Sequence, residues 1–422
     1  MTNALRNWFR TISVFFLFAA AAANLAAQPA PAASNSSHWV ASWGAAQQIP
    51  EPQNALSAED LDHAVLRQLV HLSLGGDALR IRVSNAFGFE PLRIDSIHVA
   101  RSVTPTSSAI DPATDHAVLF AGQESVILPA GAEYVSDPVA MSAEHLSTLA
   151  ITLSIPSAPK QQTGHPGSRA TTYIAHQIST SAPEMIHAHT VDHWYFLAGV
   201  DVAAPPQAHT IVAFGDSITD GHAATTNGND RWTDGLAARL QAKPASQSIG
   251  VVNVGIGGNH LLTDGLGPNA LARFDRDVLA RPAAKYLIVL EAINDLGALS
   301  RTSDATAAQH ADLVARLIAA YRQIILRAQA AGLTVYGATL TPWLGADYYH
   351  PDAASEADRV ALNAWIRTPG HFDAVIDFDR AVRDPAAPGH MLPSFDSGDH
   401  LHPSPAGYKA MADAIPLALF AR

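Results

Sequence analysis

The chain of 422 residues contains no cysteine. Disulfides, thiolate metal sites and a cysteine nucleophile are therefore excluded, and export cannot be checked from disulfide pairing. Charge is also scarce, because 15% of the residues are charged and 48% are hydrophobic, which suits a globular chain with a sizeable core. Lys and Arg number 26 against 38 Asp and Glu, and no basic run occurs, so nucleic acid is not an expected partner.

The sequence also lacks an apolar run of the roughly 20 residues that a membrane span needs. The most apolar stretch, 11–23, follows two arginines and precedes small residues, with Ala26, Ala27 or Ala32 as alternative cleavage positions. This pattern predicts a signal peptide over 1–27 and a disordered linker over 28–37, with a signal anchor as the alternative. We expect a secreted or periplasmic protein without stable membrane association after signal cleavage.

The segment 38–203 consists of short alternating runs separated by turn residues, without a long helical period. Residues 69–74 and 79–83 flank Gly75-Gly76-Asp77, which predicts a β-hairpin. Further strands are expected within 92–100, 125–128, 149–155 and 193–200. The pattern predicts an N-terminal β-sandwich or jelly-roll domain.

After a linker at 203–207 the pattern changes, and the segment 209–422 alternates strand-like runs with helices. The clearest helix is predicted between 305 and 331, where Gly332 is placed to end it. Strands are expected at 210–214, 251–254, 286–290, 333–338 and 374–378. This alternation predicts a parallel sheet between helices, with ligands bound beyond the carboxyl ends of the strands.

One such strand ends in Gly215-Asp216-Ser217. A serine hydroxyl at this position can serve as a nucleophile if a base removes its proton, and the backbone N–H groups of the following turn can face an oxyanion. The alternative is that Ser217 is an ordinary helix N-cap.

A base is available near the C-terminus, where Asp399 and His402 are three residues apart and can meet on one side of a helical turn. Asp396 and His400 form a rival pair at similar spacing, and His222 and His260 also lie near motif glycines. The spacing alone does not choose between these histidines.

Two further segments can supply oxyanion donors. Gly258 lies in the glycine-rich run 253–259 and can offer an unobstructed N–H, although such glycines also simply make tight turns. The run is not a P-loop, because the Lys-Ser/Thr ending is missing. Asn294 follows the apolar run 286–290 and can offer a side-chain N–H, unless it merely begins a loop.

In order and spacing, these four blocks resemble those of the SGNH (GDSL-type) serine hydrolases, over about 209–420. The resemblance implies a flavodoxin-like three-layer α/β/α fold and an esterase needing no cofactor or metal. It implies that Ser217 is the nucleophile, His402 the base and Asp399 its orienting acid. It further implies an oxyanion hole made by the Ser217 N–H, the Gly258 N–H and the Asn294 amide.

Two departures from the family pattern concern the pocket wall. Gly257 stands where many members have Ser, and Ala292-Ile293 where many have Gly-Gly. The front half resembles, more loosely, the N-terminal β-domain of a secreted bacterial subgroup, through Trp39 and Trp43, which we expect in its core.

We therefore expect a secreted serine esterase acting on short- to medium-chain carboxylic esters, with acetyl or feruloyl esters on carbohydrates as candidate substrates. Trp343, Tyr348 and Tyr349 are expected to line its pocket. The alternatives are an acyltransferase using the same triad, or a carbohydrate-binding protein with a residual hydrolase half.

Overall fold

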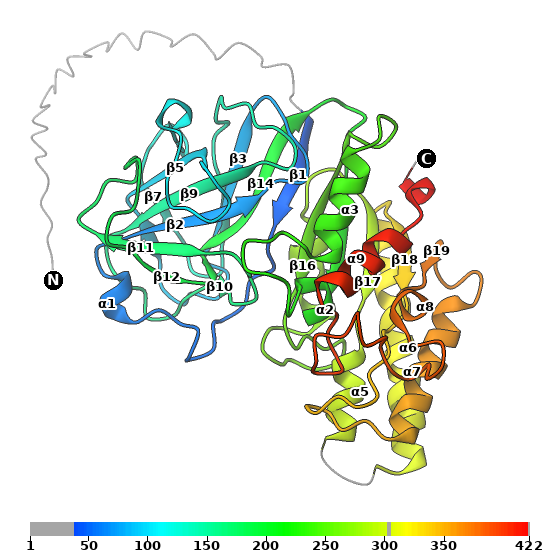
Figure 1. Cartoon of the computed structure of the whole chain (residues 1–422). Helices are drawn as coiled ribbons and strands as arrows, with labels where there is room; N and C mark the ends of the chain where they lie inside the picture. Colours follow the sequence, from blue (N-terminus) through cyan, green and yellow to red (C-terminus); the bar gives the residue numbers. More distant parts are fainter. Residues whose placement is uncertain (1–37, 302–304, 421–422) are drawn as a thin grey trace, which may run out of the picture. The chain divides into compact units, whose positions relative to one another are not determined.

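The computed structural model describes residues 38–301 and 305–420 (Figure 1). The expected signal peptide and the linker at 28–37 lie outside these residues. The described residues form one compact unit. Among the described helices, none combines the length and the apolar character that crossing a membrane requires.

The front half contains two antiparallel sheets that enclose a hydrophobic core. One has the strand order β1 (His38–Gly44), β14 (Leu197–Ala204), β3 (Leu79–Ser84) and β8 (Glu133–Val135). The other has the order β12 (His189–Val191), β11 (Thr172–His176), β2 (Ala64–His71), β9 (Thr148–Ile155), β5 (Ser96–Arg101) and β6 (His116–Ala117). Two small ladders pair β4 (Leu92–Ile94) with β7 (Val126–Leu128), and β10 (Gly164–His165) with β13 (Trp194–Tyr195). A short helix α1 (Ala58–Leu61) precedes β2.

The predicted hairpin between residues 69–74 and 79–83 is wrong, because β2 and β3 belong to different sheets. The segment between them crosses from one sheet to the other instead of turning back. Leu72 and Leu74 are buried in the sandwich core, and the Ser73 hydroxyl donates to the Ser42 carbonyl. Gly75 and Gly76 pack so closely against backbone carbonyls that no Cβ fits there. Glycine is therefore needed at these two positions because other backbone segments pass close to them, and not because the chain makes a hairpin turn.

The back half is built on a parallel sheet with the order β16 (Ile249–Gly255), β15 (His209–Gly215), β17 (Ala284–Leu290), β18 (Thr334–Ala338) and β19 (Ala374–Ile376). In sequence terms this order is 2-1-3-4-5, the flavodoxin-like arrangement, and it confirms the predicted α/β class. One helical layer contains α3 (Trp232–Gln241), α8 (Phe378–Val382) and α9 (Pro405–Ala414). The other contains α4 (Ala270–Phe274), α6 (Ala307–Ala330) and α7 (Ala353–Arg367) (Figure 1).

Helix α6 begins and ends where the local sequence signals predict. Thr306 accepts a hydrogen bond from the Gln309 N–H, and the Gln309 side chain accepts from the Thr306 N–H, which forms a capping box. At the other end Gly332 adopts a φ of 82°, a left-handed conformation that suits glycine. The helix therefore occupies almost the whole of the predicted segment 305–331.

Strand register brings the four sequence blocks to one edge of the sheet. Gly215 at the end of β15 is paired with Gly255 on β16 and with Leu290 on β17. Ser217, Gly258 and Asn294 each follow one of these paired positions by two to four residues. They must therefore gather beyond the carboxyl ends of three neighbouring strands.

Candidate active site

The serine turn is a short helix α2 (Ser217–Asp220) that begins directly after β15. Its N-cap is Asp216, whose side chain accepts a hydrogen bond from the Ile218 N–H at 2.9 Å. The alternative interpretation of Ser217 as the N-cap is therefore wrong. A Cβ at Gly215 would collide with Thr219 and with a β17 carbonyl, so the tight strand exit requires glycine. The serine side chain is left available for another partner.

That partner is His402. The Ser217 Oγ lies 2.8 Å from His402 Nε2, and His402 Nδ1 lies 2.6 Å from a carboxylate oxygen of Asp399. Ser217 and His402 are buried, whereas Asp399 is half-buried. Because Nδ1–H donates to the carboxylate, Nε2 is the nitrogen that can take the serine proton.

The Asp399 carboxylate is fixed by its own loop. Its second oxygen accepts hydrogen bonds from the N–H groups of Leu401 and His402 and from the Ser397 hydroxyl. Burial opposes ionisation, but the hydrogen bonds and charge of His402 outweigh it and hold the pKa of Asp399 well below its usual range. The pair is joined by a turn that precedes α9, and not by a helical turn as the spacing suggested.

The rival pair is also formed, since His400 Nδ1 lies 2.6 Å from Asp396 Oδ2. His400 is exposed and has a φ of 59°, and it is not among the residues that line the pocket around Ser217. The structure thus brings both Asp–His pairs together but places only His402 against the serine.

The two expected oxyanion donors lie at the same pocket. Gly258 has a φ of 65°, in the left-handed region that favours glycine. Asn294 lies in the first turn of helix α5 (Ile293–Ser300), and both polar atoms of its side chain are hydrogen-bonded. Its Nδ2 donates to the Asn259 carbonyl at 2.7 Å, and its Oδ1 accepts from the Tyr349 hydroxyl at 2.7 Å. One N–H of the amide thus remains for another acceptor.

Buried charged side chains hold the glycine-rich loop in place through hydrogen bonds. The Asp295 carboxylate accepts the N–H groups of Leu261 and Leu262, and the Arg273 guanidinium donates to the Asn259 side chain. Arg273 also donates to the buried Glu291. These contacts fix the Gly258 backbone before any substrate binds, which is the preorganisation that oxyanion stabilisation requires.

Acidic side chains gather next to the turn that carries Ser217, and their pKa values are raised. Burial, reinforced by the neighbouring Asp295 and Asp220, raises the pKa of Asp216 to about 7, although the bond from the Ile218 N–H opposes the shift. Burial and the charge of Asp216 also raise the pKa of Glu291.

These groups open into a pocket of about 720 Å³. Besides Ser217, Gly258, Asn294, Asp399 and His402, its walls include His222, Gly257, His260, Gly265, Leu266, Ala298, Arg301, Asp347, Tyr348, Tyr349 and Leu401. Tyr348 and Leu266 are exposed, and Arg301 stacks over the Tyr348 ring at 4.2 Å. Of the three predicted aromatic lining residues, Tyr348 and Tyr349 lie at the pocket and Trp343 is buried in the core.

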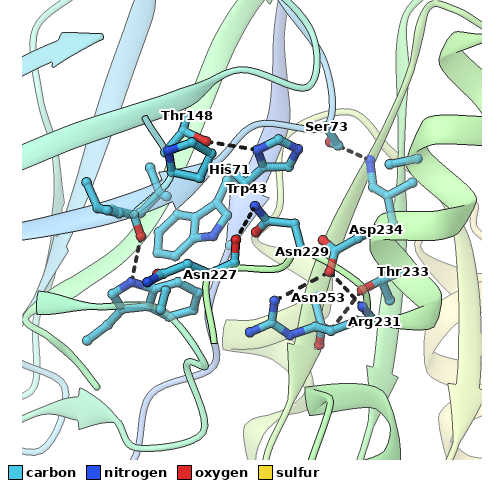
Figure 2. Close-up of a pocket in the computed structure, with 18 of the residues that line it drawn as sticks. Trp43, His71, Ser73, Thr148, Asn227, Asn229, Arg231, Thr233, Asp234 and Asn253 are labelled. Carbon is cyan, nitrogen blue, oxygen red and sulfur yellow. Dashed lines mark hydrogen bonds and ion pairs between the residues drawn. The ribbon is translucent and has the colours of Figure 1, made fainter. Parts of the chain in front are cut away.

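A second cavity, of about 50 Å³, lies between the sandwich and the back half and is drawn in Figure 2. Its polar side chains largely bind one another, such as His71 with Thr148 and Arg231 with Asp234. The space suits one or two water molecules and not an organic substrate. Trp43 lines this cavity and packs edge-on against Trp194, which fits its predicted core role.

His222 is the pocket residue whose contact sequence reasoning missed. Its ring centroid lies 4.0 Å from that of His402, and its Nδ1 lies 2.9 Å from Arg169 Nη2. Among the described residues, the set of potential metal ligands that comes together is His222, Asp399 and His402, and it coincides with the acid–base pair. No local sequence pattern links Arg169 to this site, because it belongs to the front half.

Comparison with known proteins finds a family match for the back half. Residues 213–410 match the model of the GDSL-like lipase/acylhydrolase family. No curated protein matches the chain.

Three of the similar solved structures share 19–20% identity with this chain. A protein described as lipolytic and of the G-D-S-L family, from Desulfitobacterium hafniense, is 20% identical, covers 50% of this chain and 99% of its own, and has a TM-score of 0.37. An acetyl xylan esterase from Geobacillus stearothermophilus is 20% identical, with coverages of 49% and 92% and a TM-score of 0.35. A protein described as an arylesterase, from Agrobacterium tumefaciens, is 19% identical, with coverages of 50% and 98% and a TM-score of 0.37.

Proposed function

Because residues 213–410 form a GDSL-like lipase/acylhydrolase domain, and the protein is accordingly a carboxylic ester hydrolase, we propose that it works through an acyl-enzyme on Ser217. The observation that carries the proposal is the unbroken hydrogen-bonded series from Asp399 through His402 to Ser217 at the wall of the pocket. His402 takes the serine proton while the hydroxyl oxygen attacks the ester carbonyl.

The negative charge that develops on the carbonyl oxygen is stabilised by three N–H groups, from the Ser217 backbone, the Gly258 backbone and the Asn294 amide. His402 then gives its proton to the leaving alcohol, and a water molecule releases the acyl group by the reverse route. Asp399 stays ionised and holds the imidazole in the tautomer that the cycle needs.

The proposed substrates are short- to medium-chain esters, with acetyl or feruloyl esters on carbohydrates as the favoured group. The volume of about 720 Å³ supports this size range, and the exposed Tyr348 offers an aromatic face of the kind on which a sugar ring or an aromatic acyl group can stack. The proposed place of action is outside the cytoplasm, in the periplasm or the medium, because the first residues have the pattern of a signal peptide.

The test is hydrolysis of p-nitrophenyl acetate, butyrate and octanoate by residues 38–422. Ser217→Ala and His402→Ala should each lower kcat by roughly 10⁴-fold or more. His400→Ala is the matched control, because it removes the histidine of the other Asp–His pair on the same loop and should leave kcat within about twofold of the parent.

A folded parent that hydrolyses no ester, or a Ser217→Ala variant that keeps parental activity, would contradict the proposal. Acetate release from acetylated xylan and ferulate release from a feruloylated oligosaccharide then rank the two substrate groups. Ester products formed in the presence of an added alcohol would instead indicate acyl transfer.

A further inference from the structure

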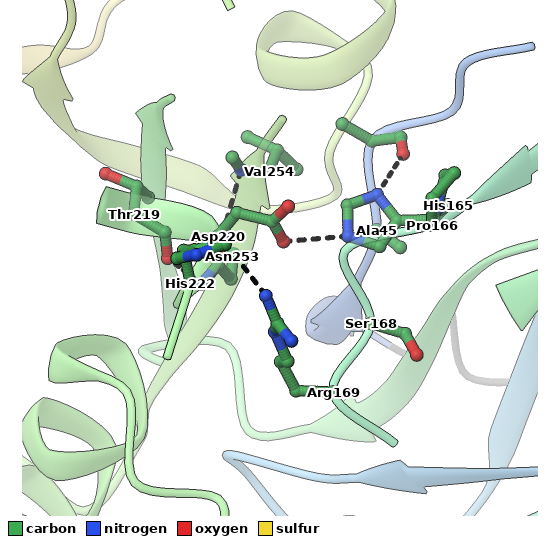
Figure 3. A network of polar contacts seen from close by, with 12 residues as sticks. Ala45, His165, Pro166, Ser168, Arg169, Thr219, Asp220, His222, Asn253 and Val254 are labelled. Atoms are coloured by element: carbon green, nitrogen blue, oxygen red, sulfur yellow. Dashed lines mark hydrogen bonds and ion pairs between the residues drawn. The ribbon is translucent and has the colours of Figure 1, made fainter. Parts of the chain in front are cut away.

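Residues 164–170 of the front half, which begin with β10, contact the serine helix α2 and His222 (Figure 3). His165 Nε2 lies 2.8 Å from a carboxylate oxygen of Asp220, the last residue of the serine helix α2, and both side chains are buried. The other ring nitrogen of His165, Nδ1, lies 2.7 Å from the Ala46 carbonyl oxygen. A Cβ at Gly167 would collide with the same Asp220 carboxylate, so this side chain packs directly against the glycine backbone.

Arg169 lies at the end of this segment. Its Nη2 is 2.9 Å from His222 Nδ1. A guanidinium can only donate hydrogen bonds, so His222 Nδ1 must be the acceptor and the proton of the neutral ring must sit on Nε2. Nε2–H points away from Arg169, since the two ring nitrogens diverge.

The backbone of His222 cannot easily move. Its N–H donates to the Ser217 carbonyl at 2.9 Å, and its carbonyl accepts from the Tyr408 hydroxyl at 2.7 Å. The exposed side chain forms part of the pocket wall, with its ring against that of His402.

Burial and the neighbouring charges keep the His222 ring neutral. Partial burial, with His402 and Arg169, lowers the pKa of His222 to about 4, and Asp399 and Asp220 only partly oppose this. At neutral pH the residue therefore offers a hydrogen-bond donor without a positive charge beside the base.

The position of His222 relative to the reaction follows from the role of His402. The base must contact the oxygen of the leaving alcohol in order to protonate it, whereas the acyl oxygen faces Gly258 and Asn294. The His222 ring, whose centroid lies 4.0 Å from that of His402 at a tilt of 37°, therefore borders the space of the alcohol half of the ester.

We propose that Arg169 is a positioning residue that holds His222 as a neutral donor, and that the His222 Nε2–H binds a hydroxyl or ether oxygen on the alcohol half of the substrate. This inference rests on the proposed esterase function and narrows its substrates to esters of polyols or sugars over esters of simple alkanols. The N-terminal sandwich thereby contributes to substrate choice through the contact of Arg169 with His222.

The test compares kcat/KM for an acetylated methyl xyloside and for ethyl acetate. His222→Phe fills similar space without a donor and should lower the ratio of kcat/KM for the xyloside acetate to kcat/KM for ethyl acetate about tenfold, as expected for one lost hydrogen bond. His222→Gln places an N–H at a reach similar to Nε2 and should recover most of the loss. Equal effects on both esters, or no recovery by Gln, would overturn the role of His222.

Arg169 is tested by pH profiles. Without its charge and its donor, the pKa of His222 should move up from about 4 toward its ordinary value, so Arg169→Ala should shift the acid limb of the xyloside profile to higher pH. Arg169→Lys keeps a cationic donor and should restore the parental limb. Arg80→Ala is the matched control, because this arginine of the same sandwich stacks on Trp39.

An unchanged acid limb in Arg169→Ala would refute the positioning role. The outcome remains separate from the proposed function, which stands or falls with Ser217. A parent that hydrolyses both esters, while the His222 variants lose both equally, would refute this inference and leave the esterase intact.

Discussion

Tyr349 gives the sharpest test of how the oxyanion hole is held. Its hydroxyl donates to Asn294 Oδ1 at 2.7 Å, and both side chains are buried, at 5% and 2% exposure. This bond and the one to the Asn259 carbonyl together fix the plane of the amide that faces the pocket. Tyr349→Phe removes the first bond and leaves the ring in place.

The size of the effect follows from two limits. A net hydrogen bond between neutral groups is worth about 0.5–1.5 kcal/mol, which corresponds to roughly 2- to 13-fold in rate. Loss of a whole oxyanion donor costs roughly 10²- to 10³-fold in kcat. We therefore expect Tyr349→Phe to lower kcat by about 3- to 10-fold with KM unchanged, and Asn294→Ala to lower it by roughly 10²- to 10³-fold.

The assay is steady-state hydrolysis of p-nitrophenyl acetate at saturation. Tyr173→Phe is the matched control, because it removes one hydroxyl that donates to a backbone carbonyl at 2.9 Å within the sandwich, and it should not change kcat. A parental kcat for Tyr349→Phe would mean that the hydroxyl does not orient Asn294. A loss as large as that of Asn294→Ala would mean that Tyr349 acts on the reacting atoms directly.

Three further predictions concern stability. Burial raises the pKa of Asp216 to about 7 in the folded protein, so its stabilising contribution is present at low pH and is lost as pH rises from about 4 through 7. Asp216→Asn keeps an acceptor for the Ile218 N–H but does not titrate. In urea unfolding between pH 4 and 8, the free energy of unfolding of this variant should therefore decline less than that of the parent. Ala292 has a φ of 94°, where an L side chain is strained, so Ala292→Gly should raise the free energy of unfolding by roughly 0.5–1 kcal/mol, and a decrease would contradict this reasoning. The fully buried Arg67 donates to the carbonyls of Ser108, Thr180 and Ala182. Arg67→Met should therefore lower the free energy of unfolding by roughly 3–5 kcal/mol, while kcat of the folded fraction stays parental. A loss below about 1 kcal/mol would show that these hydrogen bonds contribute little to stability.

The back half was predictable because its signals are local and mutually consistent. The run 286–290 within β17 is apolar on both faces, as a central parallel strand must be, and helix α6 carries its own cap and stop. Spacing predicted that Asp399 can meet His402, since both belong to one short turn, but the choice of this pair over Asp396 and His400 came from the resemblance to the SGNH hydrolases.

The front half shows where local signals fail. Gly75-Gly76 has the composition of a hairpin turn, but burial of Leu72 and Leu74 in the sandwich core takes the chain to the second sheet. The run 92–100 similarly divides between β4 and β5, which belong to different ladders. Pairing partners of strands depend on the whole sheet, which a window of ten residues does not contain.

The supporting contacts of the active site could not be predicted for a related reason. Tyr349 reaches Asn294 across 55 positions of sequence, and Arg169 reaches His222 across 53. Neither side chain has a pattern around it that indicates its partner. Only the fold brings them together.

The contact between β1 and β16 bears on how the chain can be divided. Strand β16 is the last strand on its side of the parallel sheet, and its outer side is covered by the sandwich, where the Ser73 hydroxyl accepts the Val251 N–H at 2.8 Å. Expressed alone, residues 209–422 would present β16 as an open edge with unpaired backbone groups, the kind of surface on which chains aggregate. The sandwich thus acts as a built-in cap against self-association, and engineering of this esterase should trim loops and keep the two halves joined.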